Sequence, residues 1–147
     1  MLTAKKLLLT QAFILFSGTV YAWSALLKQF GNSAFFGGSG ANPLLTACFY
    51  GSAAFLVALF WSVRAYQKPG DTNERRLRNF LLFCVVFAAS VVAYEAVEYY
   101  KLFGSSTTAF ICTPGVPPAE TPCFVGMLFF IGAFIASVCA ARRLRSA

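Results

Sequence analysis

Basic residues divide the chain into four long, mainly apolar stretches, at residues 7–27, 44–63, 79–100 and 123–141. Each stretch has 19 to 22 residues, and about 20 apolar residues in a helix cross the hydrocarbon core of a bilayer. None of them shows the alternation of polar and apolar residues that is typical of a membrane-barrel strand. The pattern therefore predicts an all-α membrane protein with four transmembrane helices.

Composition supports the same interpretation. Hydrophobic residues make up 59% of the chain and charged residues 12%, whereas a soluble domain carries about 25% charged residues. A water-soluble globular enzyme is therefore excluded. The chain has no histidine, so we expect no metal site and no resident cofactor. A secretory signal peptide is the alternative for residues 7–27, but its apolar core would have only about 7–15 residues.

The basic residues also predict an orientation. Ten of the twelve lie before the first stretch, between the second and third, or after the fourth, and only Lys28 and Lys101 lie elsewhere. Because cytoplasmic segments carry the excess of Lys and Arg, both termini should be cytoplasmic. Residues 28–43 and 101–122 should then lie outside, most simply at a plasma membrane. The net charge of +7 is a topology signal, so we expect lipid and protein partners or a second copy, and no nucleic acid.

The two halves of the chain share a sequence motif. The pattern P-x-x-T-x-C-F-x-G occurs at residues 43–51 and 118–126, 75 positions apart, and K-x-F-G-x-S begins at both Lys28 and Lys101. These matches predict a tandem repeat of two helical hairpins, residues 1–66 and 79–147, joined by a basic linker at 67–78. Both hairpins would enter the membrane from the same side, so an axis along the membrane normal would relate them.

The shared motif has a structural interpretation. Thr46 and Thr121 are candidates for helix N-caps, because a threonine oxygen can accept a hydrogen bond from the first turn. Gly51 and Gly126 follow in the first turns and offer flat surfaces for the close approach of another helix.

Five cysteines divide into an outer and an inner group. Cys112 and Cys123 bracket a proline-rich segment, and a disulfide between them would hold it. Cys48 and Cys123 each fall in the first turn of a predicted helix, where backbone amides and the helix dipole favour a thiolate and hence redox chemistry. Cys84 and Cys139 lie in the inner halves of their spans and are expected to be small core residues.

The layout of four spans with outer cysteines is similar to that of membrane thiol oxidases of the disulfide-bond-formation and vitamin K epoxide reductase types. Their hallmark is a C-x-x-C pair, which this chain lacks. The similarity concerns architecture alone and assigns the chain to neither family. An enzyme of this kind would need a reducible cysteine pair close to a quinone-sized cleft.

Glu95 and Glu98 are the only carboxylates inside a predicted span. Three residues apart on a helix, they share one face. An ionisable group at this depth is by default a candidate functional residue, and the matching positions of the first half hold alanines. The alternatives are structural pairing with Lys28 or Lys101, and contact with a cation, a proton or a quinone head.

No nucleophile–base pair, phosphate-binding loop or metal cluster is evident in the sequence. The leading interpretation is a non-catalytic accessory or scaffolding subunit of a membrane complex, with the outer loops and Glu95 and Glu98 making contacts. One alternative is a membrane thiol–disulfide oxidoreductase using Cys48 and Cys123. The other is a small channel or transporter subunit, for which the polar path below Glu95 is poor.

Overall fold

The computed structural model describes residues 2–30, 46–68, 70–102 and 116–145. Helix α1 spans Leu2–Phe30, α2 spans Ala47–Gln67, α3 spans Asp71–Tyr99, and α4 spans Pro122–Arg145 after a short 3-10 helix at Pro118–Glu120. All four α-helices are long and apolar enough to cross a membrane, and no strand occurs within the described ranges. The prediction of an all-α, four-span membrane protein is therefore confirmed at this level.

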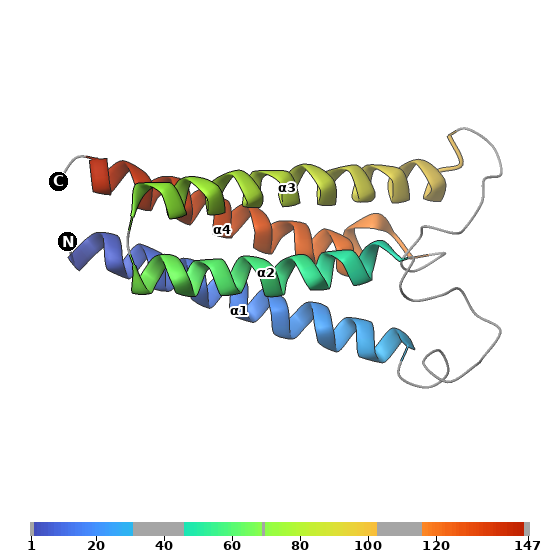
Figure 1. The fold of residues 1–147 in the computed structure, drawn as a ribbon. Coiled ribbons are helices and arrows are strands. Elements are labelled where there is room, and N and C mark those ends of the chain that lie inside the picture. The colour runs from blue at the N-terminus through green and yellow to red at the C-terminus, as the bar shows by residue number, and fades with distance from the viewer. Residues whose placement is uncertain (1, 31–45, 69, 103–115, 146–147) are drawn as a thin grey trace.

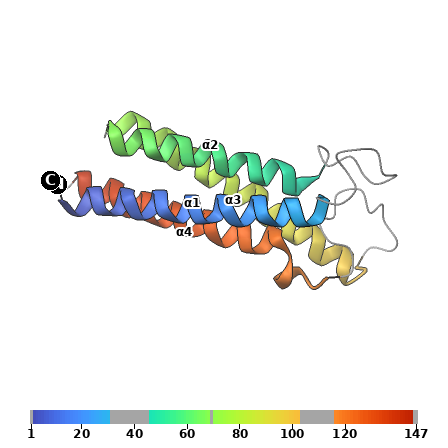
Figure 2. The same cartoon turned by 90° about the horizontal axis from the view of Figure 1, so that it is seen from below.

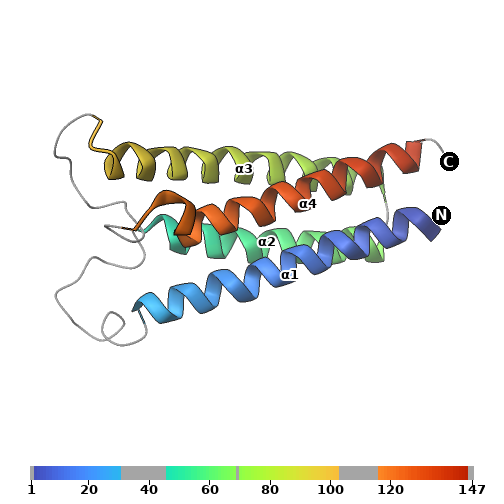
Figure 3. The same cartoon turned by 180° about the vertical axis from the view of Figure 1, so that it is seen from behind.

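The four helices run side by side as an antiparallel bundle. Both termini and the short connection between α2 and α3 lie at one end (Figure 1). The opposite end, where α1 and α3 stop and α2 and α4 begin, is called the loop end below. Helix α1 packs along α2 and α4, and α4 also packs along α3, whereas α2 and α3 pack less closely (Figures 2 and 3).

Burial separates the interior of the bundle from an apolar outer surface. Leu15, Phe55 and Leu81 are buried in the centre. Phe13 and Phe83 project outward with 68% and 66% of their surface exposed. A helix of a soluble protein would carry polar residues on that outer face. Apolar side chains on both faces are what a bundle surrounded by lipid requires, which supports a multi-pass membrane protein.

The third helix begins earlier than its apolar stretch. Gly70 is its N-cap residue, and its carbonyl accepts hydrogen bonds from Asn73 N and Glu74 N at 3.1 and 3.2 Å. Residues 71–78, which the sequence assigned to the linker, are therefore helical. They extend α3 beyond its apolar part by about 12 Å at 1.5 Å per residue, and only residues 68–70 separate α2 from α3.

The loop end of α3 closes with a left-handed residue. Lys101 has a φ of 51°. Its N–H donates to Glu98 O at 3.0 Å, and Leu102 N donates to Val97 O at 3.1 Å. This pair of bonds is the Schellman ending, which glycine usually supplies because a side chain is strained in that conformation.

Phe55 is the central packing residue of the bundle. Its ring stacks on Phe130 with centroids 3.9 Å apart and planes 10° from parallel. On the other side it meets α1 at Gly18, where an added Cβ would lie 2.5 Å from Phe55 Cε1. Gly18 is thus the position at which the absence of a side chain lets a neighbouring helix approach.

Candidate active site at the loop end of the bundle

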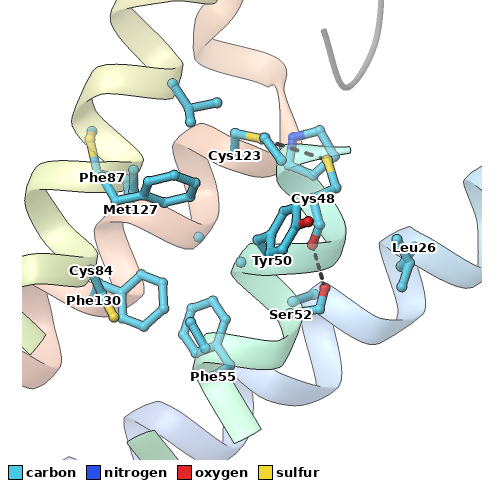
Figure 4. A pocket seen from close by; sticks show the side chains of 18 of the residues that line it. Leu26, Cys48, Tyr50, Ser52, Phe55, Cys84, Phe87, Cys123, Met127 and Phe130 are labelled. Carbon is cyan, nitrogen blue, oxygen red and sulfur yellow. Dashed lines mark hydrogen bonds between the residues drawn. The ribbon is translucent and has the colours of Figure 1, made fainter. Parts of the chain in front are cut away.

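Two sulfur atoms meet where α2 and α4 begin. Cys48 and Cys123 each occupy the second position of their helix, and their Sγ atoms are 3.6 Å apart (Figure 4). A disulfide bond is about 2.05 Å long, so this separation is a non-bonded contact between sulfurs. Cys48 is itself disulfide-bonded, so the contact places the sulfur of Cys123 beside an existing disulfide. The structure thus brings together the two cysteines that the sequence singled out for redox chemistry.

The first turns of both helices are anchored in the same way. The carbonyl oxygens of Thr46 and Thr121 accept hydrogen bonds from Phe49 N and Phe124 N, each at 3.1 Å. Thr121 also caps with its side chain, because Phe124 N donates to its Oγ1 at 3.3 Å. Thr46 occupies the N-cap position in extended conformation without a side-chain capping bond. Both motif copies therefore present their cysteine at the same level of the bundle.

A buried carboxyl group adjoins this sulfur pair. Glu95 of α3 is only 4% exposed, and it makes a side-chain hydrogen bond and an electrostatic contact with Cys123. The sequence suggested Lys28 or Lys101 as companions of Glu95, and the thiol was not anticipated. Glu98, one turn nearer the loop end, is half-buried.

An apolar pocket extends from the sulfur pair into the bundle. It has a volume of about 430 Å³ and is lined by residues of all four helices, including both cysteines (Figure 4). No charged side chain is among its described lining residues. Six aromatic side chains contribute to the lining: Tyr50, Phe55, Phe80, Phe83, Phe87 and Phe130.

Three residues that line the pocket also lie on the outer surface of the bundle. Tyr50 on α2 and Phe83 and Phe87 on α3 line it and are themselves exposed, by 52%, 66% and 39%. These are the two neighbouring helices that pack less closely. In a membrane, these three exposed side chains would face the lipid.

The two glycines of the repeated motif, Gly51 and Gly126, leave room in the pocket because they have no side chain. A Cβ added at Gly51 would meet nothing within 4 Å, and one added at Gly126 would lie 3.6 Å from Phe55 Cε2. Both glycines line the pocket. The sequence assigned them to close helix packing, and the structure differs at Gly51 because no other helix approaches it. The signal that could have revealed the pocket was the spacing, since Cys-x-x-Gly places both residues on one helix face.

The three remaining cysteines are not part of the sulfur pair. Cys84 is buried and lines the pocket below the sulfur pair (Figure 4). Cys139 is exposed on α4, so its expected place in the core is wrong. Cys112 lies outside the described residues, and its predicted disulfide with Cys123 stays a prediction. Within the described part of the chain, no group of three His, Cys, Asp or Glu residues could hold a metal ion.

Comparisons of the chain with family models, with curated proteins and with solved structures found no match. The functional argument therefore depends on the arrangement of the sulfur pair, the carboxyl group and the pocket.

Proposed function

We propose that the protein is a membrane thiol–disulfide oxidoreductase whose redox pair is Cys48 and Cys123. The observation that carries this proposal is the 3.6 Å contact between the two Sγ atoms, which are supplied by the first turns of two different helices. Thiol–disulfide exchange proceeds by direct attack of one sulfur on another. A pair already in contact needs little movement for that attack.

The exchange step can be written with these two residues. The thiolate of Cys123 attacks Sγ of Cys48 while Cys48 is joined to the sulfur of a substrate thiol. The bond between Cys48 and the substrate sulfur breaks, a bond between Cys48 and Cys123 forms, and the substrate leaves as a thiolate that takes up a proton. Run in the opposite direction, a substrate thiolate opens the Cys48–Cys123 disulfide, and Cys123 leaves.

Glu95 would serve as the proton acceptor for Cys123. A charged sulfur is costly in apolar surroundings, so the thiol must pass its proton to a group in contact with it. The hydrogen bond between Glu95 and Cys123 supports this role. A side chain that transfers a proton in this way needs to lie within hydrogen-bonding distance.

The direction of net electron flow follows from the proposed topology. If the basic residues mark the cytoplasmic side, the loop end faces outward, where disulfides form and persist. In a plasma membrane the sulfur pair would then oxidise thiols of exported proteins. The predicted accessory role is less well supported, because Glu95 is buried within its own chain and offers little surface to another subunit.

The test is to trap the substrate. When the reduced protein is given a disulfide substrate, the Cys48 thiolate attacks it, one substrate thiolate leaves and a mixed disulfide forms; replacing Cys123 with serine should leave this mixed disulfide in place, because the sulfur that would attack it is gone. We expect mixed disulfides that are seen on non-reducing gels of the Cys123→Ser variant and are absent when Cys48→Ser is added. Cys139→Ser is the matched control, since Cys139 lies on the same helix and is exposed away from the sulfur pair.

A second measurement checks the pair directly. Mass spectrometry of the full chain after mild oxidation should identify a peptide that links Cys48 to Cys123. If Cys123 is instead linked only to Cys112 at every redox potential, or if Cys123→Ser traps no more substrate than Cys139→Ser, the proposal is wrong. Association with a membrane complex that survives loss of both cysteines, without any exchange activity, would favour the accessory role.

A further inference from the structure

The interior of the bundle holds polar side chains toward the end that carries both termini. Gln11 of α1 and Ser62 of α2 are both 0% exposed. Within the described part of the chain, the amide oxygen and nitrogen of Gln11 and the hydroxyl of Ser62 have no hydrogen-bond partner. Buried polar groups are rarely left unpaired, and an ordered water is a common explanation for those that are. We infer that Gln11 and Ser62 bind a water molecule between the helices, with Ser137 of α4 as a further contact.

A contact at the centre of the bundle fixes the level of Gln11 and Ser62. Gly18 of α1 lies against the ring of Phe55 of α2, because an added Cβ would be 2.5 Å from Phe55 Cε1. Helix α1 runs toward the loop end and α2 runs away from it (Figure 1). Gln11 is seven residues before Gly18, and Ser62 is seven residues after Phe55. Seven residues are nearly two full turns, about 10.5 Å, so both side chains return to the facing sides of their helices at one level.

Helix α4 brings a third polar group to this level. Phe130 stacks on Phe55 with ring centroids 3.9 Å apart, and α2 and α4 run in the same direction (Figure 1). Ser137 is seven residues after Phe130, as Ser62 is after Phe55. Ser137 is also buried, with 4% of its surface exposed. The two serines are 75 positions apart, the same offset as the repeated motif, so both halves of the chain supply a hydroxyl at this depth.

The packing of α4 against α1 gives the same level independently. A Cβ added at Gly132 would lie 3.8 Å from Ile14 Cγ2. Ser137 is five residues after Gly132, and Gln11 is three residues before Ile14. In this antiparallel pair, the two polar side chains therefore differ in level by two residues, about 3 Å. Because α1 packs along both α2 and α4, its inward-facing amide lies between the two serines.

The chemistry of the three side chains selects water as the ligand. The carboxamide of Gln11 offers two N–H donors and a carbonyl acceptor, and each serine hydroxyl can donate and accept. None of the three carries a charge, so they offer no counter-charge to a buried ion. Buried water makes about three hydrogen bonds, and these groups can supply that number. The neighbouring inward positions on α2 and α4 hold fully buried alanines, which leave no polar alternative: Ala58, Ala65, Ala133 and Ala140.

An aromatic layer separates this water site from the sulfur pair. Phe55 and Phe130 line the apolar pocket at its end far from Cys48 and Cys123 (Figure 4). Their stacked rings and the buried side chain of Leu15 lie in the central core. The bound water therefore lies in the half of the bundle near the termini and does not extend to the cysteines. The inference is independent of the proposed redox function.

Solid-state NMR of the full-length protein in lipid bilayers tests the site. The measurement is the transfer of magnetisation from water protons to the side-chain amide of Gln11 in ¹⁵N-labelled protein. The chain has only two other glutamines, Gln29 and Gln67, so the loss of one signal in Gln11→Met identifies the amide. We expect its transfer to be slower than that of the exposed Gln67 and clearly faster than that of the backbone N–H of Leu15 in the dry core.

The serines that hold the water are tested in the same way. Ser62→Ala should lower the transfer to Gln11 about 2- to 10-fold, the factor that one hydrogen bond contributes to an equilibrium. Adding Ser137→Ala should lower it further. Ser52→Ala is the matched control, because Ser52 is also a buried serine of α2 but donates its own hydrogen bond to Cys48 O at 2.8 Å. It should leave the transfer to Gln11 unchanged, and the backbone spectrum of each variant should show that the fold is intact.

Three results would overturn the inference. Transfer to Gln11 that is no faster than transfer to the Leu15 backbone in the wild type would show that no water is bound. Transfer that is unchanged in the Ser62→Ala, Ser137→Ala double variant would show that these serines do not hold it. Transfer to Leu15 as fast as that to Gln67 would show a bundle that is hydrated throughout, without a defined site.

Discussion

Replacing Glu95 with glutamine tests the chemistry of the site most directly. Glutamine keeps the shape of the side chain and removes its charge and its ability to accept the proton of Cys123. Glu95 is 4% exposed and hydrogen-bonded to Cys123, so water cannot easily take over its role. A positioned proton acceptor contributes about 10²- to 10⁴-fold to a rate. We therefore expect a loss of at least about 100-fold, or about 2.7 kcal/mol of activation free energy.

The assay is the rate at which Cys123 reacts with an uncharged maleimide, read by mass spectrometry in a Cys48→Ser background. The rate of the Glu95→Gln variant should be lower than that of the parent, because no carboxylate is then placed to take the proton of Cys123. Glu98→Gln is the matched control, since it makes the same chemical change one turn away on a half-buried side chain. It should change the rate by less than about twofold.

The reasoning is refuted if Glu95→Gln leaves the alkylation rate within twofold of the parent. It is also refuted if Glu98→Gln reduces the rate as much as Glu95→Gln does. Helix content and thermal unfolding should be measured alongside, because a partly unfolded variant would expose Cys123 and raise its alkylation rate instead of lowering it.

Three further predictions concern packing, local strain and topology. Gly18→Ala should destabilise the bundle by about 1–2 kcal/mol, because its Cβ would meet Phe55 at 2.5 Å and this overpacking outweighs the gain in helix propensity of about 0.5–1 kcal/mol. The control Gly132→Ala, whose Cβ would have its nearest neighbouring atom at 3.8 Å, should be neutral or stabilising. An unfolding temperature that is higher for Gly18→Ala than for Gly132→Ala would contradict this prediction. Lys101→Gly should stabilise by about 1 kcal/mol, because it relieves a left-handed side-chain residue, and an unchanged or lower unfolding temperature would argue against it. An impermeant maleimide should label a cysteine introduced at Gly70 only from the cytoplasm and one at Lys101 only from outside, and labelling of Gly70→Cys from outside would invert the proposed orientation.

Sequence alone determined the number of membrane spans. Apolar stretches of about 20 residues between basic clusters leave no other compact arrangement, since every backbone group inside a bilayer must be hydrogen-bonded within a helix or a closed barrel. The repeated motif also singled out Cys48 and Cys123, because identical residues opening two spans are placed at matching depths. The depth of a residue in the membrane follows from its position along the helix, so it can be predicted from the sequence.

Only the tertiary structure decided which groups meet across the bundle. Three outer cysteines allow several pairings, and connectivity cannot be deduced from spacing alone; the packing of α2 against α4 selects the contact between Cys48 and Cys123. The contact of Glu95 with Cys123 joins α3 to α4 across the intervening loop. The pocket is lined by residues of all four helices, so its existence depends on how they pack together.

The physical reason is that hydropathy does not distinguish the inside of a membrane bundle from its outside. Lipid tails are as apolar as the core, so no hydrophobic force turns one helix face inward. Leu8 is 2% exposed and its neighbour Leu9 is 57% exposed, although the two side chains are identical. Lateral neighbours are selected by shape, by small residues such as Gly18 that permit close approach, and by the few polar contacts such as that of Glu95, and these act only once the helices lie together.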